Sequence, residues 1–237
     1  MTAAAMPAGL LDAARAPYRS AGRFAYEFAR GKLAGDPAYR AILERGLLQG
    51  RPRVLDPGCG LGLLAAVLRA AERCAEDGGW PAGWPAAPRG LSIRGIELMP
   101  HTVQRARRAL GGAAEIVQGD IRSADFGAAD AVVILDVLHY IEAAAHRGLL
   151  ARVHATLPPA GLLLLRVADA AGGLRFRCGQ CWDQAVMLAR GRGWIRQHCR
   201  SLGEWRTLLL ECGFDSQVMS MSEGTPFANV LLCARPR

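Results

Sequence analysis

Four apolar runs in this sequence of 237 residues each end in an acidic residue, and carboxylates at such places can bind cations or hydroxyl groups. The acidic residues are Asp56, Glu97, Asp120 and Asp136. The runs have strand length and alternate with helix-like segments, which is typical of an α/β fold with a parallel sheet. Since ligands bind at the carboxyl ends of parallel strands, we expect the four carboxylates near one ligand site.

A glycine-rich turn follows the first of these runs. Gly58, Gly60 and Gly62 let the backbone turn sharply and place no side chains between it and a bound molecule. An apolar-periodic helix starts near Leu63, so its free N–H groups and dipole favour a carboxylate or phosphate in the loop. Leucine at position 63 breaks the dinucleotide-binding pattern, and the Gly-Lys-Ser/Thr of a phosphate-binding P-loop is absent from this turn.

The run Asp-x-Gly-x-Gly-x-Gly from Asp56 to Gly62 resembles the first motif of the class I S-adenosylmethionine-dependent methyltransferases. The resemblance implies that Asp56 binds the ammonium group of the cofactor and that the helix N-terminus binds its carboxylate. It places Glu97 at the ribose hydroxyls and Asp120 near the adenine amino group. The remaining cofactor-binding positions that it implies are Gly58, Cys59, Gly60, Gly62, Leu98, Ile121 and Asp136.

The order of elements predicts the seven-stranded, mostly parallel sheet of that family, a three-layer Rossmann-like fold. Five strands alternate with helices, and two further strands follow a helix over 202–211. Because only residues 222–228 separate the last two strands, they must pair antiparallel. The expected strands are 53–56, 91–97, 114–117, 131–136, 162–167, 215–221 and 229–234.

The methyltransferase domain is expected over residues 51–237, after an N-terminal helical segment over 1–50. That segment either folds over the cofactor and substrate or only covers one edge of the sheet. A Gly/Pro/Trp-rich stretch over 74–90 predicts an inserted loop. Residues 170–200 interrupt the strand–helix alternation with arginines and tryptophans, and we interpret them as a cap over the substrate.

His139 follows the fourth strand by three residues and is the candidate general base, the alternative being a histidine that only makes local hydrogen bonds. Tyr140, Tyr18 and Tyr26 are weaker candidates for lining the pocket. The run from Asp136 to His139 lacks the Pro-Pro-aromatic sequence of enzymes that methylate planar amino groups. We therefore expect O- or C-methylation of a small molecule.

A second resemblance suggests the substrate class. The runs over 28–33 and 222–232 are similar to methyltransferases of bacterial aryl-polyene (xanthomonadin-type) pigment pathways. This implies an aromatic or phenolic acceptor, free or carried by an acyl carrier protein. Such carriers are acidic, which suits the arginines over 175–200.

Composition limits the remaining alternatives. The formal net charge is +8 and the pI about 9.6, so a non-catalytic protein that binds nucleic acid or a partner through its basic surface is the second hypothesis. Seven cysteines without a disulfide framework predict a reducing, cytoplasmic location, and no apolar run is long enough to span a membrane. Cys178 and Cys181, with His198 and Cys199, have loose spacing for zinc, and we expect no metal.

Overall fold

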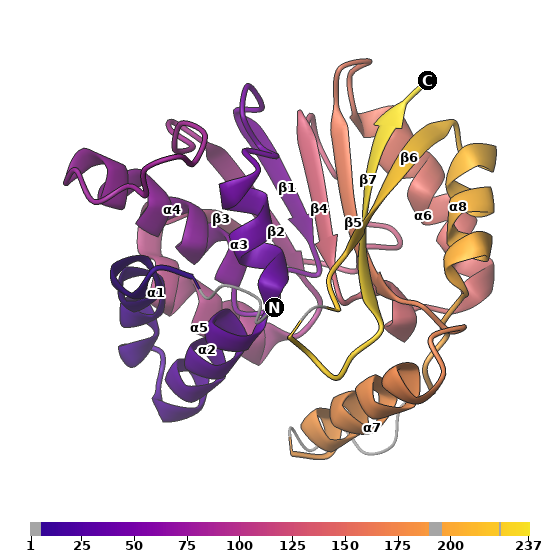
Figure 1. Ribbon diagram of the computed structural model, residues 1–237, viewed down its shortest axis with the longest axis horizontal. Helices are drawn as coiled ribbons and strands as arrows, with labels where there is room; N and C mark the ends of the chain where they lie inside the picture. The colour runs from indigo at the N-terminus through magenta and orange to yellow at the C-terminus, as the bar shows by residue number, and fades with distance from the viewer. Residues whose placement is uncertain (1–5, 190–195, 223) are drawn as a thin grey trace. The chain divides into compact units, whose positions relative to one another are not determined.

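The computed structural model describes residues 6–189, 196–222 and 224–237 of the chain (Figure 1). The described chain forms two compact units, which we call the N-terminal unit and the C-terminal unit. The first ends at Val132 and the second begins at Val133. This boundary lies inside one strand, β4 (Ala131–Leu135). Trp194, Arg190 and Arg192 of the predicted cap lie outside the described residues.

The strands form a seven-stranded sheet in the order β3-β2-β1-β4-β5-β7-β6. β1 pairs in parallel with β2 and β4, and β2 pairs in parallel with β3. β7 pairs antiparallel with both β5 and β6. This sheet confirms the predicted fold class. The strands other than β4 are β1 (Arg53–Pro57), β2 (Ser92–Glu97), β3 (Glu115–Gln118), β5 (Leu162–Ala168), β6 (Phe214–Ser220) and β7 (Asn229–Pro236).

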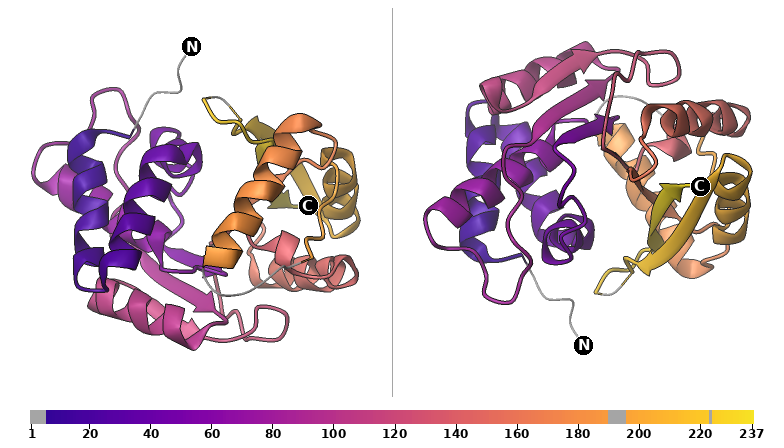
Figure 2. Two further views of the ribbon diagram at one scale, coloured as in Figure 1. Left: turned by 90° about the horizontal axis from the view of Figure 1, so that it is seen from below. Right: turned by 90° about the horizontal axis from the view of Figure 1, so that it is seen from above.

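Helices of the N-terminal unit pack around β1–β3. α4 follows the glycine-rich turn and buries most of its apolar residues, and α1 packs on both α4 and α2 (Figure 2). Asp36 starts α3 by accepting a hydrogen bond from the Ala38 N–H at 3.0 Å, with Pro37 at the first helical position. These helices are α1 (Ala8–Arg15), η1 (Ala16–Arg19), α2 (Arg23–Gly35), α3 (Pro37–Glu44), α4 (Leu63–Glu76), α5 (Pro100–Leu110) and η2 (Gly111–Ala113).

The C-terminal unit has its core on β5, whose first six residues are buried. α8 begins with a capping box, in which the Ser201 side chain accepts from the Glu204 N–H and the Glu204 carboxylate accepts from the Ser201 N–H. No helix of the described chain is long and apolar enough to cross a membrane. The helices are η3 (Leu138–Tyr140), α6 (Ala143–Thr156), α7 (Leu174–Ala189) and α8 (Leu202–Glu211).

The predicted loop over 74–90 is ordered by aromatic contacts. α4 continues to Glu76, so the non-helical part begins three residues later than expected. The rings of Trp80 and Trp84 lie edge to face with centroids 5.4 Å apart, and the Trp80 indole N–H donates to the Pro85 carbonyl at 2.9 Å. Because the Arg40 guanidinium lies over the Trp84 ring, the loop also contacts α3.

Gly95 on β2 gives a testable prediction, because the glycine-rich turn approaches it closely. A Cβ at this position would lie 2.7 Å from the Cys59 Sγ and 2.9 Å from the Ile116 Cδ1. We expect Gly95→Ala to lower the free energy of unfolding by about 2 kcal/mol, as overpacking does. Chemical denaturation measures the change.

Gly148 provides the matched control. A Cβ there meets nothing within 4 Å, and the residue lies within α6. Gly148→Ala should therefore raise the free energy of unfolding by up to about 1 kcal/mol. Equal destabilisation by the two substitutions would contradict the close approach at Gly95.

Candidate cofactor and acceptor residues

The glycine-rich turn between β1 and α4 has the backbone that its sequence demands. Gly58, Gly60 and Gly62 have φ angles of 80°, 57° and 74°, a region that favours glycine. The N–H groups of Gly58 and Cys59 both donate to the Ile96 carbonyl, at 2.7 and 3.1 Å, so the turn is fixed against β2. Since no described side chain caps the first turn of α4, its N–H groups can bind an anion.

Glu97 lies at the end of β2 and contacts the same turn. Its Oε2 accepts from the Gly60 N–H at 3.2 Å, and its Oε1 accepts from the Met99 N–H at 2.8 Å. These bonds hold both carboxylate oxygens, each of which has a second lone pair for another donor. A hydroxyl group is a suitable donor, which agrees with the implied ribose contact.

Asp56 is a buried carboxylate with little nearby to balance a negative charge. It is 5% exposed, and among the described residues no cation lies within ion-pair distance of it. Burial and the nearby charge of Glu97 raise the pKa of Asp56 to about 7. Because a buried carboxylate ionises readily only beside a cation, an ammonium group fits this position.

Tyr18 connects the N-terminal helices to the glycine-rich turn. It is fully buried, and its hydroxyl donates to the Leu61 carbonyl at 3.0 Å. Burial, with the charges of Cys59 and Asp56, raises the pKa of its phenol, so Tyr18 remains a neutral donor. The sequence suggested Tyr18 only as a lining residue and gave no sign of this bond across 43 positions.

The residues predicted to contact adenine differ in how available they are to a ligand. The Arg122 Nε and Nη2 donate to Asp120 at 2.6–3.0 Å, and this pairing lowers the pKa of the carboxyl group. An adenine amino group would therefore share Asp120 with Arg122. Ile121 is 6% exposed, whereas Leu98 is 52% exposed and offers the larger apolar surface to a ligand.

Asp136, in the C-terminal unit, pairs with a residue that the sequence analysis missed. Its Oδ2 lies 3.3 Å from the Nη1 of Arg166, which is 4% exposed on β5. Asp136 also has a φ of 57°, an uncommon conformation for a residue other than glycine that is often found at functional sites. The signal in the sequence was the single charge in the apolar run over 162–168.

His139 and Tyr140 lie together on η3, directly after β4. Their ring centroids are 4.0 Å apart, and the His139 carbonyl accepts from the His198 N–H at 2.8 Å. The turn is closed by the Tyr140 N–H, which donates to the Val137 carbonyl at 2.9 Å. Both residues are partly exposed, although the Nε2 atom of His139 is itself buried.

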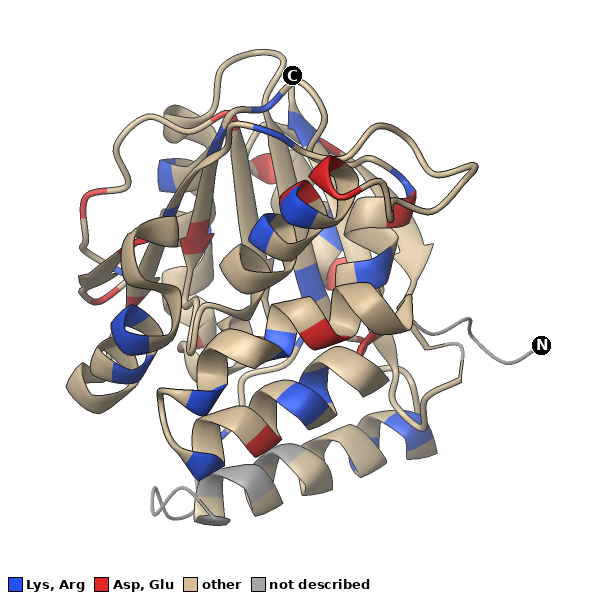
Figure 3. Ribbon diagram, turned by 90° about the vertical axis from the view of Figure 1, so that its left-hand side faces the viewer, with Lys and Arg blue, Asp and Glu red and all other residues tan. Residues whose placement is uncertain are grey.

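The predicted cap and basic surface are only partly described. Arg175, Arg177, Cys178 and Cys181 are exposed on α7. Within the described ranges, no three His, Cys, Asp or Glu side chains are grouped as a metal site. Figure 3 shows Lys and Arg spread over several elements with Asp and Glu among them, so the positive charge is distributed widely.

The sequence matches the methyltransferase-domain family over residues 27–217. The chain belongs to this family. The matched range includes the glycine-rich turn, all four acidic strand ends and His139. This methyltransferase domain thus has its candidate cofactor residues within the part that defines the family.

Known proteins support the same assignment. The methyltransferase domain is 33% identical over 129 residues to the carboxy-S-adenosyl-L-methionine synthase of Chromohalobacter salexigens, covering 52% of this chain and 42% of that protein. It also resembles human N-acetylserotonin methyltransferase in complex with S-adenosylmethionine (22% identity, TM-score 0.62), covering 98% of this chain and 60% of that one. The domain also resembles an O-methyltransferase of neocarzinostatin biosynthesis, in complex with S-adenosylmethionine and 2-hydroxy-5-methyl naphthoic acid. The two chains are 20% identical with a TM-score of 0.54, and the match covers 78% of this chain and 49% of that one.

The methyltransferase domain spans about half the length of these relatives, and the two structures establish the fold. S-adenosylmethionine is the cofactor of the family. The residues present fit this cofactor, since the buried Asp56 lacks a described cation and the α4 N-terminus lacks a described cap. An ammonium group would suit the first of these places, and a carboxylate would suit the second.

The pKa of Asp56 predicts coupled proton release. At pH 6.5 the carboxyl group of the free protein is mostly protonated, and binding of an ammonium group favours its ionised form. Calorimetric titration with S-adenosylhomocysteine in buffers of different ionisation enthalpy should show release of about 0.7 proton at pH 6.5, falling toward zero at pH 8.

Asp56→Asn is the control for this titration. It should bind more weakly and release no proton. The same raised pKa makes the wild-type protein lose stability relative to Asp56→Asn as the pH rises from about 4 to about 7, with little further loss above that. Buffer-independent binding heats in the wild-type protein at pH 6.5 would contradict the assignment of Asp56.

Tyr18→Phe tests the bond to the glycine-rich turn. The substitution removes one buried donor from the Leu61 carbonyl, which costs about 1–3 kcal/mol of stability and loosens the turn. We expect affinity for S-adenosylhomocysteine to fall about tenfold, as a loss of that size in binding implies. Tyr26→Phe is the matched control on α2 and should leave the affinity for S-adenosylhomocysteine unchanged. If the two variants bound S-adenosylhomocysteine equally well, the role of Tyr18 would be contradicted.

Proposed function

We propose that the protein transfers a methyl group from S-adenosylmethionine to a small molecule, by O- or C-methylation of an aromatic or phenolic acceptor. The observation that carries the proposal is the buried Asp56 carboxylate beside a glycine-rich turn fixed against β2. In this proposal the ammonium group binds at Asp56, and the cofactor carboxylate binds at the α4 N-terminus. Glu97 accepts from the ribose hydroxyls, and Asp120, Ile121 and Leu98 receive the adenine.

The bound cofactor supplies a methyl group that its sulfonium already activates, so the chain needs only to align the acceptor and exclude water. His139 acts as the base that removes the proton of a phenol, and Tyr140 lines the acceptor pocket. We also propose Asp136, which has a left-handed backbone and pairs with Arg166, as a cofactor-binding residue.

Two features support an aromatic acceptor and an acyl carrier as its source. The neocarzinostatin enzyme resembled by this chain was crystallised with a hydroxynaphthoic acid. The exposed Arg175 and Arg177 of α7 offer positive charge to an acidic carrier protein. We propose residues 170–200 as the cap that contacts the acceptor.

The likeness to a carboxy-S-adenosyl-L-methionine synthase supports a second candidate, in which the product is a modified cofactor. Mass spectrometry of the recovered cofactor separates the two activities. A methyltransferase yields S-adenosylhomocysteine and a methylated acceptor, whereas a synthase, supplied with a co-substrate that donates a carboxyl group, yields a carboxylated cofactor.

The first experiment is calorimetric titration with S-adenosylhomocysteine, with NADH as the control ligand, followed by a screen of phenolic acids. For an accepted phenol, His139→Ala should lower kcat by about 10²-fold or more, because it removes the base, and should leave affinity for S-adenosylhomocysteine unchanged. Tyr140→Phe should have a smaller effect. Folded protein that binds no S-adenosylhomocysteine would favour the non-catalytic alternative, in which affinity for nucleic acid falls steeply with salt.

A further inference from the structure

His146 lies on α6, seven residues after His139, and no part of the proposed reaction uses it. The ring is fully buried, and its Nε2 lies 2.9 Å from the Leu138 carbonyl oxygen and 3.0 Å from the Ile141 carbonyl oxygen. Because carbonyl oxygens only accept hydrogen bonds, Nε2 carries the proton and donates to both. The two carbonyls come directly before and after His139–Tyr140 in the chain.

Arg200 determines the state of this ring from the other side. Its Nε–H donates to the His146 Nδ1 at 3.2 Å, which requires Nδ1 to be an acceptor and the ring to be neutral. Burial and the Arg200 charge lower the pKa of His146, although its bond to the Leu138 carbonyl acts in the opposite direction. His198 adds a smaller effect that also disfavours the charged ring.

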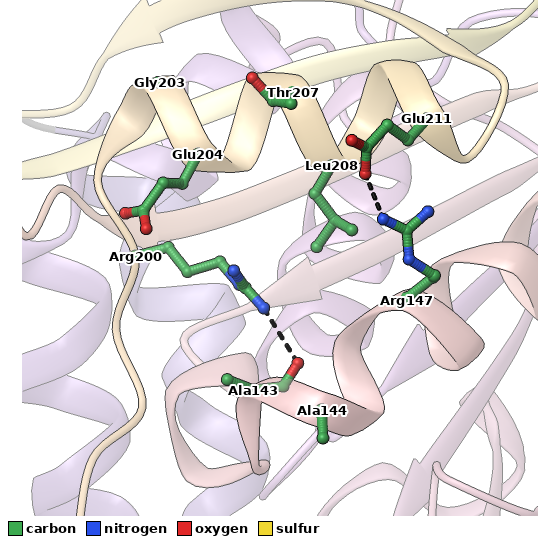
Figure 4. A pocket seen from close by; sticks show the side chains of 9 residues that line it. All are labelled: Ala143, Ala144, Arg147, Arg200, Gly203, Glu204, Thr207, Leu208 and Glu211. Carbon is green, nitrogen blue, oxygen red and sulfur yellow. Dashed lines mark hydrogen bonds and ion pairs between the residues drawn. The ribbon is translucent and has the colours of Figure 1, made fainter.

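Aromatic packing fixes both partners in place. Trp205 of α8 stacks on the His146 ring with centroids 4.9 Å apart, and the Arg200 guanidinium lies 5.9 Å from the Trp205 ring. Arg200 also donates through Nη2 to the Ala143 carbonyl at 3.0 Å (Figure 4). The guanidinium therefore has three restraints on its orientation.

The segment that carries Arg200 is itself bonded to the same turn and to the two residues that follow β5. The His198 N–H donates to the His139 carbonyl, and the Ala170 N–H donates to the Arg200 carbonyl at 3.1 Å. Asp169 accepts from the Leu202 N–H at 2.9 Å, directly after Arg200 and Ser201. Three of the four carbonyls over residues 138–141 thus accept hydrogen bonds from His146 or from this segment.

We propose that His146 and Arg200 are positioning residues for the acceptor reaction: the neutral His146 ring, oriented by Arg200, fixes the turn that presents His139 and Tyr140. This inference rests on the proposed function of His139. Arg200 is the last residue of the proposed cap, but its guanidinium is bonded to His146 and to the Ala143 carbonyl, so neither residue touches the acceptor in this proposal. They act through the carbonyls of Leu138 and Ile141.

Two isosteric substitutions separate positioning from general stability. His146→Gln places an amide N–H near the position of Nε2, so the turn keeps a donor. His146→Asn places its polar atoms near Nδ1, so the contact with Arg200 is kept but the turn loses its donor. We expect His146→Gln to keep kcat within threefold of the wild type, and His146→Asn and Arg200→Ala to lower kcat at least tenfold, with KM changed less than kcat.

Arg147→Ala is the matched control. Arg147 is the next residue on α6 and pairs with Glu211 of α8 across the groove that Arg200 also lines (Figure 4). It has no bond to the turn among those described. Its loss should leave kcat within twofold of the wild type, although the same pair of helices is perturbed.

Amide hydrogen exchange gives a readout that does not depend on activity. Exchange at Tyr140, Ile141 and His198 should accelerate at least fivefold in His146→Asn and Arg200→Ala, but not in His146→Gln or Arg147→Ala. Equal exchange or equal kcat in the Gln and Asn variants would overturn the inference. Absence of methyl transfer by the wild-type protein would overturn the proposed function, and exchange would still decide whether His146 fixes the turn.

Discussion

The N-terminal unit is organised around a carboxylate that is held away from water with no described cation beside it. Asp56 is the next-to-last residue of β1, and burial strongly disfavours its charge. The surrounding backbone gives little help, because the nearby N–H groups are directed elsewhere. Those of Gly58 and Cys59 bind the Ile96 carbonyl, and that of Gly60 binds Glu97. The free protein is therefore electrostatically prepared for a positively charged group.

The predictions that succeeded concern features that are set by residues close together in the sequence. The strand, turn and helix over 53–76 follow from local residue types, since glycine is required at three left-handed positions and apolar residues recur at helical spacing. The antiparallel pairing of β6 and β7 followed from the short connection between them. At least one end of every strand differed from the prediction by one or two residues, because the point where a strand ends depends on its pairing with neighbouring strands.

Pairings between distant residues were beyond the sequence analysis. The Tyr18 bond to Leu61 spans 43 positions, and the contact of His146 with Arg200 spans 54. No motif beside any of these residues indicates which residue it will contact. Asp136 and Arg166 meet because Asp136 directly follows β4 and Arg166 lies on the neighbouring strand, β5. By contrast, Arg122, which donates to Asp120, is only two residues away, so the sequence could have indicated this pair although the sequence analysis did not name it.

The strand order of the C-terminal unit has a consequence for how the chain is made. β7 lies between β5 and β6, although it follows both in the sequence. During synthesis from the N-terminus, β6 leaves the ribosome before the only strand that it pairs with in the described sheet. Until β7 follows, the facing edges of β5 and β6 both present unpaired backbone groups, and such edges recruit other chains. The nascent protein is therefore most exposed to aggregation between the synthesis of β6 and the synthesis of β7.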